Sequence, residues 1–201
     1  FEEFVHNYRY DFAPREYVKY LTQGFATPSG KVELKNSILE QLGYDPLPHY
    51  VEPPFSPEAR PELAEDYPLV LIAGRGFRSI NKCKGEKMSQ LEPTVAINPQ
   101  LAKVLDVQDG DWVWIETPVG KARHRAMITD EVAPGVIHAS RSRLFFERIA
   151  NADDIARLFE LNINVCLDDD PDTCDEACGS WCMRGVLCRA EKVTQSESRG
   201  R

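Results

Sequence analysis

A Gly-Arg-Gly tripeptide at residues 74–76 directly follows an apolar run, residues 69–73, whose composition predicts a buried strand. Glycine lets a ligand approach the backbone, and the Arg75 guanidinium offers a planar fork of N–H donors that suits a phosphate. As an isolated tripeptide, Gly-Arg-Gly favours an ordinary surface turn with a solvated arginine. Its place at the end of a buried strand favours an anion-binding site instead.

The loop after this tripeptide, residues 77–91, contains basic and polar side chains that could extend such a site: Arg78, Ser79, Asn81, Lys82, Lys84 and Lys87. A run of this kind is equally typical of a solvated surface loop. The composition alone leaves both interpretations open.

The cysteines suggest a metal site, but their spacing argues against one. Of the six cysteines, all but Cys83 lie between residues 166 and 188. Cys174, Cys178 and Cys182 are each separated by three residues, whereas zinc knuckles prefer Cys-x2-Cys and iron–sulfur clusters have their own tight spacings. A chain of this size does not need a disulfide scaffold. We therefore expect reduced thiols and no metal ligands, and the role of this cluster with Cys188 stays open.

The other residues that could do chemistry give no support to nucleophilic or acid–base catalysis. The four histidines lie far apart in the sequence, and no Ser-His-Asp, Cys-His or paired-carboxylate arrangement occurs. His138 lies inside a predicted strand, which favours a strand residue with a local hydrogen bond over a catalytic base. We predict no catalytic residue in this chain, and we do not expect a complete small enzyme.

Short strands separated by tight turns must position these residues. The predicted strands with few helices argue for a mainly β fold, a closed barrel or a sandwich, and they cover residues 69–73, 94–97, 111–116, 122–128, 136–139 and 186–193. Asn98 can cap a short helix that has Pro99 in its first position. Leu101, Val104 and Leu105 would then share one apolar face of that helix.

The strand at residues 111–116 has two distinct faces and lies between two turns. Asp109-Gly110 turns the chain before it, because glycine accepts a positive φ, and Pro118 and Gly120 close the turn after it. Successive side chains of a strand point to opposite faces. We therefore place Trp112, Trp114 and Glu116 on one face and Val113 and Ile115 on the other.

Composition and charge exclude two classes of partner. The 201-residue chain has a formal net charge of −8, whereas a nucleic-acid-binding domain is more often basic with clustered Lys and Arg. No apolar run approaches the roughly 20 residues that cross a bilayer, so direct membrane insertion is not expected. The first residues contain no initiator Met, basic leader or apolar core of a signal peptide, so we expect part of a longer protein whose compartment this chain does not reveal.

Four segments differ in composition. Residues 1–43 are mixed and aromatic. Within them we expect a short strand at 32–34 and a helix that starts at Asn36 or Ser37 and runs through Leu42, with Gly43 as its C-cap. Residues 44–67 are rich in proline, which excludes helix and sheet and predicts an extended connector over a surface. Residues 68–193 form the β-rich domain, and the polar residues 194–201 are expected to be a disordered tail.

The order of several segments resembles the C-terminal dinucleotide-binding domain of the molybdopterin oxidoreductases, the dimethyl sulfoxide reductase family. The segments that carry the resemblance are 27–33, 47–50, the connector, 67–75, 93–120 and 181–189. The family's strand that ends in a small residue, Gly and Arg is similar to residues 69–75, and its Asn-x-Asn segment is similar to residues 162–164. Residues 140–147 depart from the family, because its tryptophans are missing here, so the substrate type cannot be transferred.

The resemblance implies a six-stranded double-psi β-barrel over residues 68–193 that binds molybdopterin guanine dinucleotide carrying molybdenum or tungsten. Residues 1–43 would then be the remnant of the preceding domain. An anionic dinucleotide needs backbone N–H groups, cations and amides around it. The implied cofactor-binding residues are Gly74, Arg75, Gly76, Ser79, Asn162, Asn164 and Arg184. Their side chains or backbone amides would line one face of the barrel.

For the intact protein the resemblance implies a two-electron redox reaction, or a hydration, at the metal. The iron–sulfur cluster and the metal-ligating residue of such enzymes come from earlier domains, so this chain alone is expected to be inactive and to hold no bound cofactor. Its implied partners are the remaining domains of the same polypeptide and an iron–sulfur electron-transfer subunit. The alternative is a non-enzymatic double-psi barrel that recognises another protein, since a fold does not fix a function.

Overall fold

The computed structural model describes residues 17–74, 93–140, 155 and 158–194. The chain divides into two compact units, residues 1–49 and residues 50–201. In the second unit, the described residues form six strands: β1 (Leu69–Gly74), β2 (Thr94–Ile97), β3 (Trp112–Glu116), β4 (Lys121–Ile128), β5 (Val136–Ser140) and β6 (Arg184–Lys192). Each overlaps a strand predicted from the sequence, with ends that differ by at most two residues.

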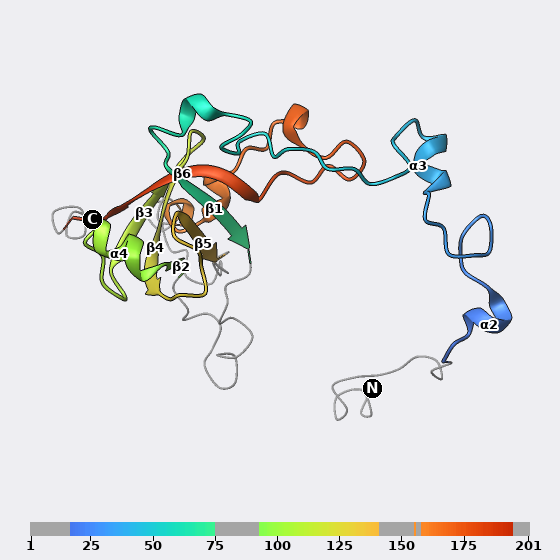
Figure 1. Ribbon diagram of the computed structural model, residues 1–201, viewed down its shortest axis with the longest axis horizontal. Helices are drawn as coiled ribbons and strands as arrows, with labels where there is room; N and C mark the ends of the chain where they lie inside the picture. Colours follow the sequence, from blue (N-terminus) through green and yellow to red (C-terminus); the bar gives the residue numbers. More distant parts are fainter. Residues whose placement is uncertain (1–16, 75–92, 141–154, 156–157, 195–201) are drawn as a thin grey trace. The chain divides into compact units, whose positions relative to one another are not determined.

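The six strands close into a barrel in the order β1-β5-β2-β4-β3-β6 (Figure 1). Two pairs are parallel, β1 with β5 and β2 with β4, and both join strands that are not consecutive in the sequence. The other four pairs are antiparallel. The mainly β chain with short helices and the six-stranded double-psi β-barrel are thus confirmed.

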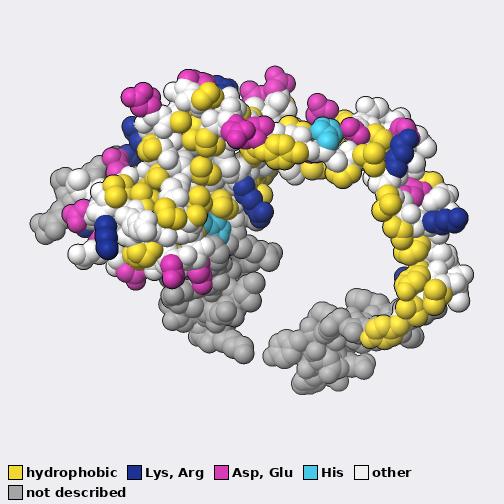
Figure 2. All heavy atoms as spheres, in the orientation of Figure 1, with side chains coloured by type: hydrophobic (Ala, Val, Ile, Leu, Met, Phe, Trp, Pro, Cys, Tyr) yellow, Lys and Arg dark blue, Asp and Glu magenta, His cyan; other side chains and the backbone are white. Residues whose placement is uncertain are grey.

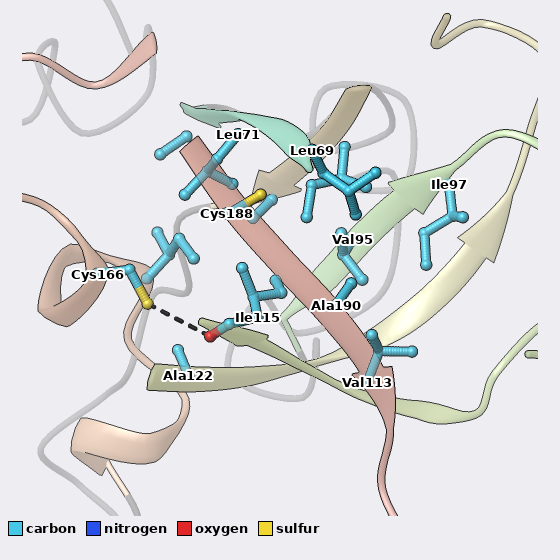
Figure 3. Close-up of a cluster of buried hydrophobic side chains, with 14 of the residues drawn as sticks. Leu69, Leu71, Val95, Ile97, Val113, Ile115, Ala122, Cys166, Cys188 and Ala190 are labelled. Atoms are coloured by element: carbon cyan, nitrogen blue, oxygen red, sulfur yellow. Dashed lines mark hydrogen bonds between the residues drawn. The ribbon is translucent and has the colours of Figure 1, made fainter. Parts of the chain in front are cut away.

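The barrel interior is apolar because alternate residues of each strand point inward. In β4, the residues Ala122, His124 and Ala126 are buried, whereas the intervening cationic residues are partly exposed. Leu71, Ile115 and Ile137 are 0% exposed and come from three different strands. Figure 3 shows this core with Cys166 and Cys188, two thiols that are also buried.

The outer face of β3 and β4 interleaves aromatic and cationic side chains. The expected division of β3 is confirmed, since Val113 and Ile115 are buried and the other three residues are partly exposed. The Arg125 guanidinium lies 4.2 Å from the Trp112 ring centroid, and the Lys121 ammonium lies 4.9 Å from that of Trp114. Such cation–π contacts stabilise the β3–β4 pairing from outside the barrel.

The helix α4 (Pro99–Val104) begins as predicted. The Asn98 side chain accepts a hydrogen bond from the backbone N–H of Gln100 at 2.9 Å, and its amide donates to the Val132 carbonyl at 2.8 Å. The expected apolar face is wrong in one position, because Val104 is 81% exposed and Ala102 is buried instead. Leu101 and Leu105 are partly buried against the core together with Ala102, so Val104 lies on the opposite, solvent side of the helix.

The first unit contains the short helices α2 (Tyr20–Gln23) and α3 (Ser37–Gln41), and neither has a buried residue. α3 begins at Ser37, one of the two expected starts, with Asn36 as its N-cap, and it ends at Gln41, one residue before the expected end. Gly43 follows with φ +86°. The expected strand at residues 32–34 is wrong, because these residues pair with no strand, and Val32 and Leu34 are exposed. Apolar side chains stay exposed along residues 17–47 (Figure 2).

Within the second unit, residues 50–67 contact β6 at two points. The backbone N–H of Leu187 donates to the Phe55 carbonyl at 2.8 Å, and the Arg189 guanidinium lies 5.6 Å from the Tyr67 ring centroid. A 3-10 turn, η1 (Pro61–Leu63), interrupts the extended course. Of the residues that the structure describes, none belongs to a helix long and apolar enough to cross a membrane.

Candidate functional site

The strand directions bring four chain segments to one end of the barrel. β1 and β5 are parallel, so Gly74 and Ser140, the last residues of these strands, lie side by side. β6 runs antiparallel to β1 and begins at the same end, with Arg184 paired to Ile72. β3 ends there as well, because both β1 and β3 are antiparallel to β6. We call this end, where β1, β3 and β5 finish, the ligand end.

Gly74 and Arg184 lie close to the same buried side chain at the ligand end. A Cβ built on Gly74 would be 3.6 Å from His138 Nε2, an ordinary contact. Burial lowers the pKa of His138, and the positive charge of Arg184 lowers it further. His138 is therefore neutral near pH 7, while the Arg184 side chain is exposed and charged. An exposed cation next to the bare backbone of Gly74 suits an anionic ligand.

The Asn-x-Asn segment lies at the same end because it is anchored to the β3–β4 turn. It leads into a 3-10 turn, η4 (Ile163–Cys166), whose Ile163 is fully buried in the barrel core. The Thr117 hydroxyl donates to the Cys166 carbonyl at 2.8 Å, and the Cys166 thiol donates to the Ile115 carbonyl at 3.6 Å (Figure 3). These contacts fix η4 on the turn between β3 and β4.

Two further features of the β4 side support this segment. The Arg123 guanidinium forms an ion pair with Glu160 at 2.8 Å, two residues before Asn162. Gly120 passes so close to η4 that a built Cβ would be 2.1 Å from the Val165 carbonyl oxygen. Glycine is therefore required at this position for a steric reason. The sequence indicated Gly120 as a turn residue, and no pattern in the sequence pointed to this contact.

The two asparagines of the segment differ in availability. The Asn162 side-chain oxygen accepts a hydrogen bond from the Asn164 backbone N–H at 3.1 Å, so it caps η4. This is the local structural role that asparagine often has at a turn. The Asn164 side chain is exposed and offers both a donor and an acceptor. Of the two, Asn164 is the better placed to contact a ligand.

A second buried histidine, which the sequence analysis did not single out, reaches the ligand end from inside the barrel. His124 is 0% exposed, and its Nε2 lies 3.1 Å from the Ser140 carbonyl oxygen. Burial lowers its pKa to about 4, so the ring is neutral and Nε2 carries the proton that it donates. The signal available in the sequence was its place between Ala122 and Ala126 on the inward face of β4.

Of the predicted site residues, Gly74, Asn162, Asn164 and Arg184 are described, and all four lie at or lead into the ligand end. Arg75, Gly76 and Ser79 lie outside the described residues. The cysteines that the structure describes are free thiols, namely Cys166, Cys174, Cys178, Cys182 and Cys188. Within the described ranges, no three His, Cys, Asp or Glu side chains gather as a metal site.

The described donor set fits an extended anionic group with hydrogen-bonding edges. It combines an exposed cation (Arg184), an exposed amide (Asn164) and a glycine backbone (Gly74), which come from β6, the η4 segment and β1. These residues come from separate elements of the ligand end, so an extended ligand suits the set better than a compact ion. Such a set can bind and orient a phosphorylated ligand, and it contains no general acid or base at the surface.

A family model described as "Molydopterin dinucleotide binding domain" matches residues 74–173. Acetylene hydratase of Syntrophotalea acetylenica is 39% identical over 127 residues, which are 61% of this chain and 17% of that protein. Dopamine dehydroxylase of Eggerthella lenta is 33% identical over 124 residues, which are 57% of this chain and 12% of that protein. The chain therefore spans less than a fifth of the length of these relatives.

A solved structure shares the fold. The acetylene hydratase from Pelobacter acetylenicus superimposes with a TM-score of 0.70 and 34% identity, over 85% of this chain and 24% of that one. The superposed part is thus one portion of a much larger polypeptide. Trimethylamine-N-oxide reductase of Haemophilus influenzae is a more distant relative, 25% identical over 142 residues.

Proposed function

Because this chain carries a molybdopterin dinucleotide-binding domain of the dimethyl sulfoxide reductase family of molybdopterin oxidoreductases, we propose that its ligand end holds one molybdopterin guanine dinucleotide. The observation that carries the proposal is the convergence of Gly74, Arg184 and the anchored Asn162–Asn164 segment at one end of the barrel. An ordinary β-barrel does not require these segments, up to 110 positions apart in the sequence, to lie at the same end.

Each proposed contact has a distinct chemical task. The Gly74-Arg75-Gly76 segment and Ser79 supply backbone N–H groups, a guanidinium and a hydroxyl for the pyrophosphate. Arg184 supplies a second cation, and Asn164 supplies an amide that can pair with a pterin or guanine edge. Asn162 contributes by capping the turn that presents Asn164. The glycine backbone and these donors orient the cofactor without taking part in bond making.

In the intact protein, the cofactor supplies molybdenum or tungsten for a two-electron redox reaction, or for a hydration. This chain binds and orients the dinucleotide, and its barrel shields one side of the cofactor from water. The remaining domains of the polypeptide supply the rest of the site, and an iron–sulfur subunit is the proposed electron-transfer partner. A non-enzymatic protein-recognition module is not favoured, because the relatives include several molybdopterin enzymes.

The test uses the full-length protein and measures how much pterin and guanine nucleotide it contains per polypeptide after denaturation. We expect the Arg184→Ala and Asn164→Ala variants to contain less of both than the wild type. Lys192→Ala is the matched control, because it removes an exposed cation from the far end of the same strand, where the Lys192 ammonium pairs with Asp111. Equal cofactor content in all four proteins would refute the residue assignment, and a wild type without pterin would refute the function.

A further inference from the structure

We propose that Thr117 is a positioning residue for the dinucleotide, because its buried hydroxyl fixes the η4 segment and thereby presents Asn162 and Asn164 at the ligand end. This inference rests on the proposed function. Thr117 does not reach the ligand itself. It lies in the turn between β3 and β4, is 3% exposed, and faces the segment that carries the two asparagines.

The hydrogen bonds of the Thr117 hydroxyl explain why this side chain holds two chain segments at once. Its proton goes to the Cys166 carbonyl at 2.8 Å, the shorter of two acceptor distances, since the Gly120 carbonyl is 3.4 Å away. Its oxygen accepts from the backbone N–H groups of Val119 and Gly120, at 3.2 and 3.3 Å. The hydroxyl therefore fixes the turn with its lone pairs and the η4 segment with its proton.

The steric fit at Gly120 shows that this contact leaves little room for adjustment. The Val165 carbonyl lies where a Cβ of residue 120 would be, so the turn and η4 are in direct backbone contact. Ile163, fully buried, fixes the other side of η4 in the barrel core. The β3–β4 turn therefore positions the η4 segment that carries Asn164. The Thr117 hydroxyl forms the shorter of the two side-chain hydrogen bonds that hold this segment, the other being the bond from the Cys166 thiol to Ile115.

Replacing the hydroxyl by a methyl group separates the positioning role from the shape of the side chain. Thr117→Val keeps the volume, but it leaves the buried Cys166 carbonyl and two turn N–H groups without this partner. Thr117→Ser keeps the hydroxyl and removes only the methyl group. Thr129→Val is the matched control, since the Thr129 hydroxyl also accepts a turn N–H, from Glu131, but lies beyond the end of β4 at the opposite end of the barrel.

The experiment follows loss of the cofactor from the full-length holoprotein, as pterin fluorescence and guanine nucleotide in the filtrate over time. The temperature is kept well below the unfolding midpoint of each variant. We expect Thr117→Val to release cofactor roughly tenfold faster than the wild type or more, and Thr117→Ser and Thr129→Val to release it at the wild-type rate. If Thr117→Val does not fold, Thr117→Cys, whose thiol is only a weak donor, replaces it with the same expectation.

The outcomes distinguish this inference from the proposed function. If the folded Thr117→Val protein retains cofactor as the wild type does, Thr117 has only a structural role and the inference is overturned, while the function stands. The same conclusion follows if Thr117→Ser fails to restore retention. If the wild-type protein holds no pterin at all, the proposed function fails and the inference fails with it.

Discussion

The buried His124 should make the stability of the barrel depend on pH. In the folded chain its pKa is about 4, compared with 6.5 for an ordinary histidine, because burial disfavours the charged ring. Between these two values the unfolded chain binds a proton that the folded chain does not, so stability falls as the pH falls from 6.5 towards 4. One unit of pKa difference corresponds to about 1.36 kcal/mol, so the lowered pKa of His124 alone reduces the free energy of unfolding by roughly 3 kcal/mol over this range.

The perturbation is His124→Gln, which removes the titration and keeps a side-chain N–H that can donate to the Ser140 carbonyl. The assay is denaturant-induced unfolding of both proteins at several values between pH 7 and pH 4. We expect the wild type to lose roughly 3 kcal/mol more than the variant over this range. His138, Asp111 and Glu116 also have lowered pKa values, but they are present in both proteins and their contributions cancel in the comparison.

Equal pH dependence of the two unfolding free energies would refute the reasoning. It would mean that His124 is accessible to protons in the folded barrel, and hence that the end of β5 is not held by a neutral, buried imidazole. A larger pH dependence in the variant would also contradict it, because the removed group is the one whose protonation favours the unfolded chain.

Three further predictions concern packing, capping and the thiols. Gly120→Ala should destabilise the barrel by about 1–3 kcal/mol, because the added Cβ would clash with a backbone carbonyl. The control is Gly135→Ala, whose Cβ would have no atom within 4 Å, so its stability should fall only by the cost of an alanine at φ +82°. Denaturant unfolding curves of both variants measure the difference. Asn98→Ala should lower the free energy of unfolding by about 1–3 kcal/mol, since it removes a helix cap and the hydrogen-bond donor to the Val132 carbonyl. Asn36→Ala removes the cap of α3 in the other unit and should leave the unfolding midpoint of the barrel unchanged. A thiol-reactive chromogenic reagent should find six thiols in the unfolded chain and should react slowly with Cys166 and Cys188 in the folded one, because burial raises the pKa of both; fewer than six thiols would indicate disulfides.

Local patterns in the sequence were sufficient for most of the barrel. Each of the six strands was predicted within two residues of its ends, because alternation and turn residues such as Gly110 act over a few positions. The cap at Asn98 was equally local. The errors arose where tertiary packing decided the outcome. Val104 is exposed because only one side of α4 faces the barrel, and residues 32–34 pair with no strand among the residues that the structure describes.

The candidate site was predictable as a set of residues, and its arrangement was not. The sequence by itself determined which residue types could bind a phosphorylated, hydrogen-bonding ligand, since the chemistry of Arg184 or Asn164 does not depend on the fold. Only the tertiary structure decided that Gly74, Arg184 and the η4 segment lie at one end of the barrel, because strand direction and register are set by long-range pairing. The tertiary structure alone revealed the hydrogen bonds from Thr117 to the Cys166 carbonyl and from His124 to the Ser140 carbonyl. It also revealed the close approach of the Val165 carbonyl to Gly120. These contacts join residues that are far apart in the sequence, and no local pattern encodes such distances.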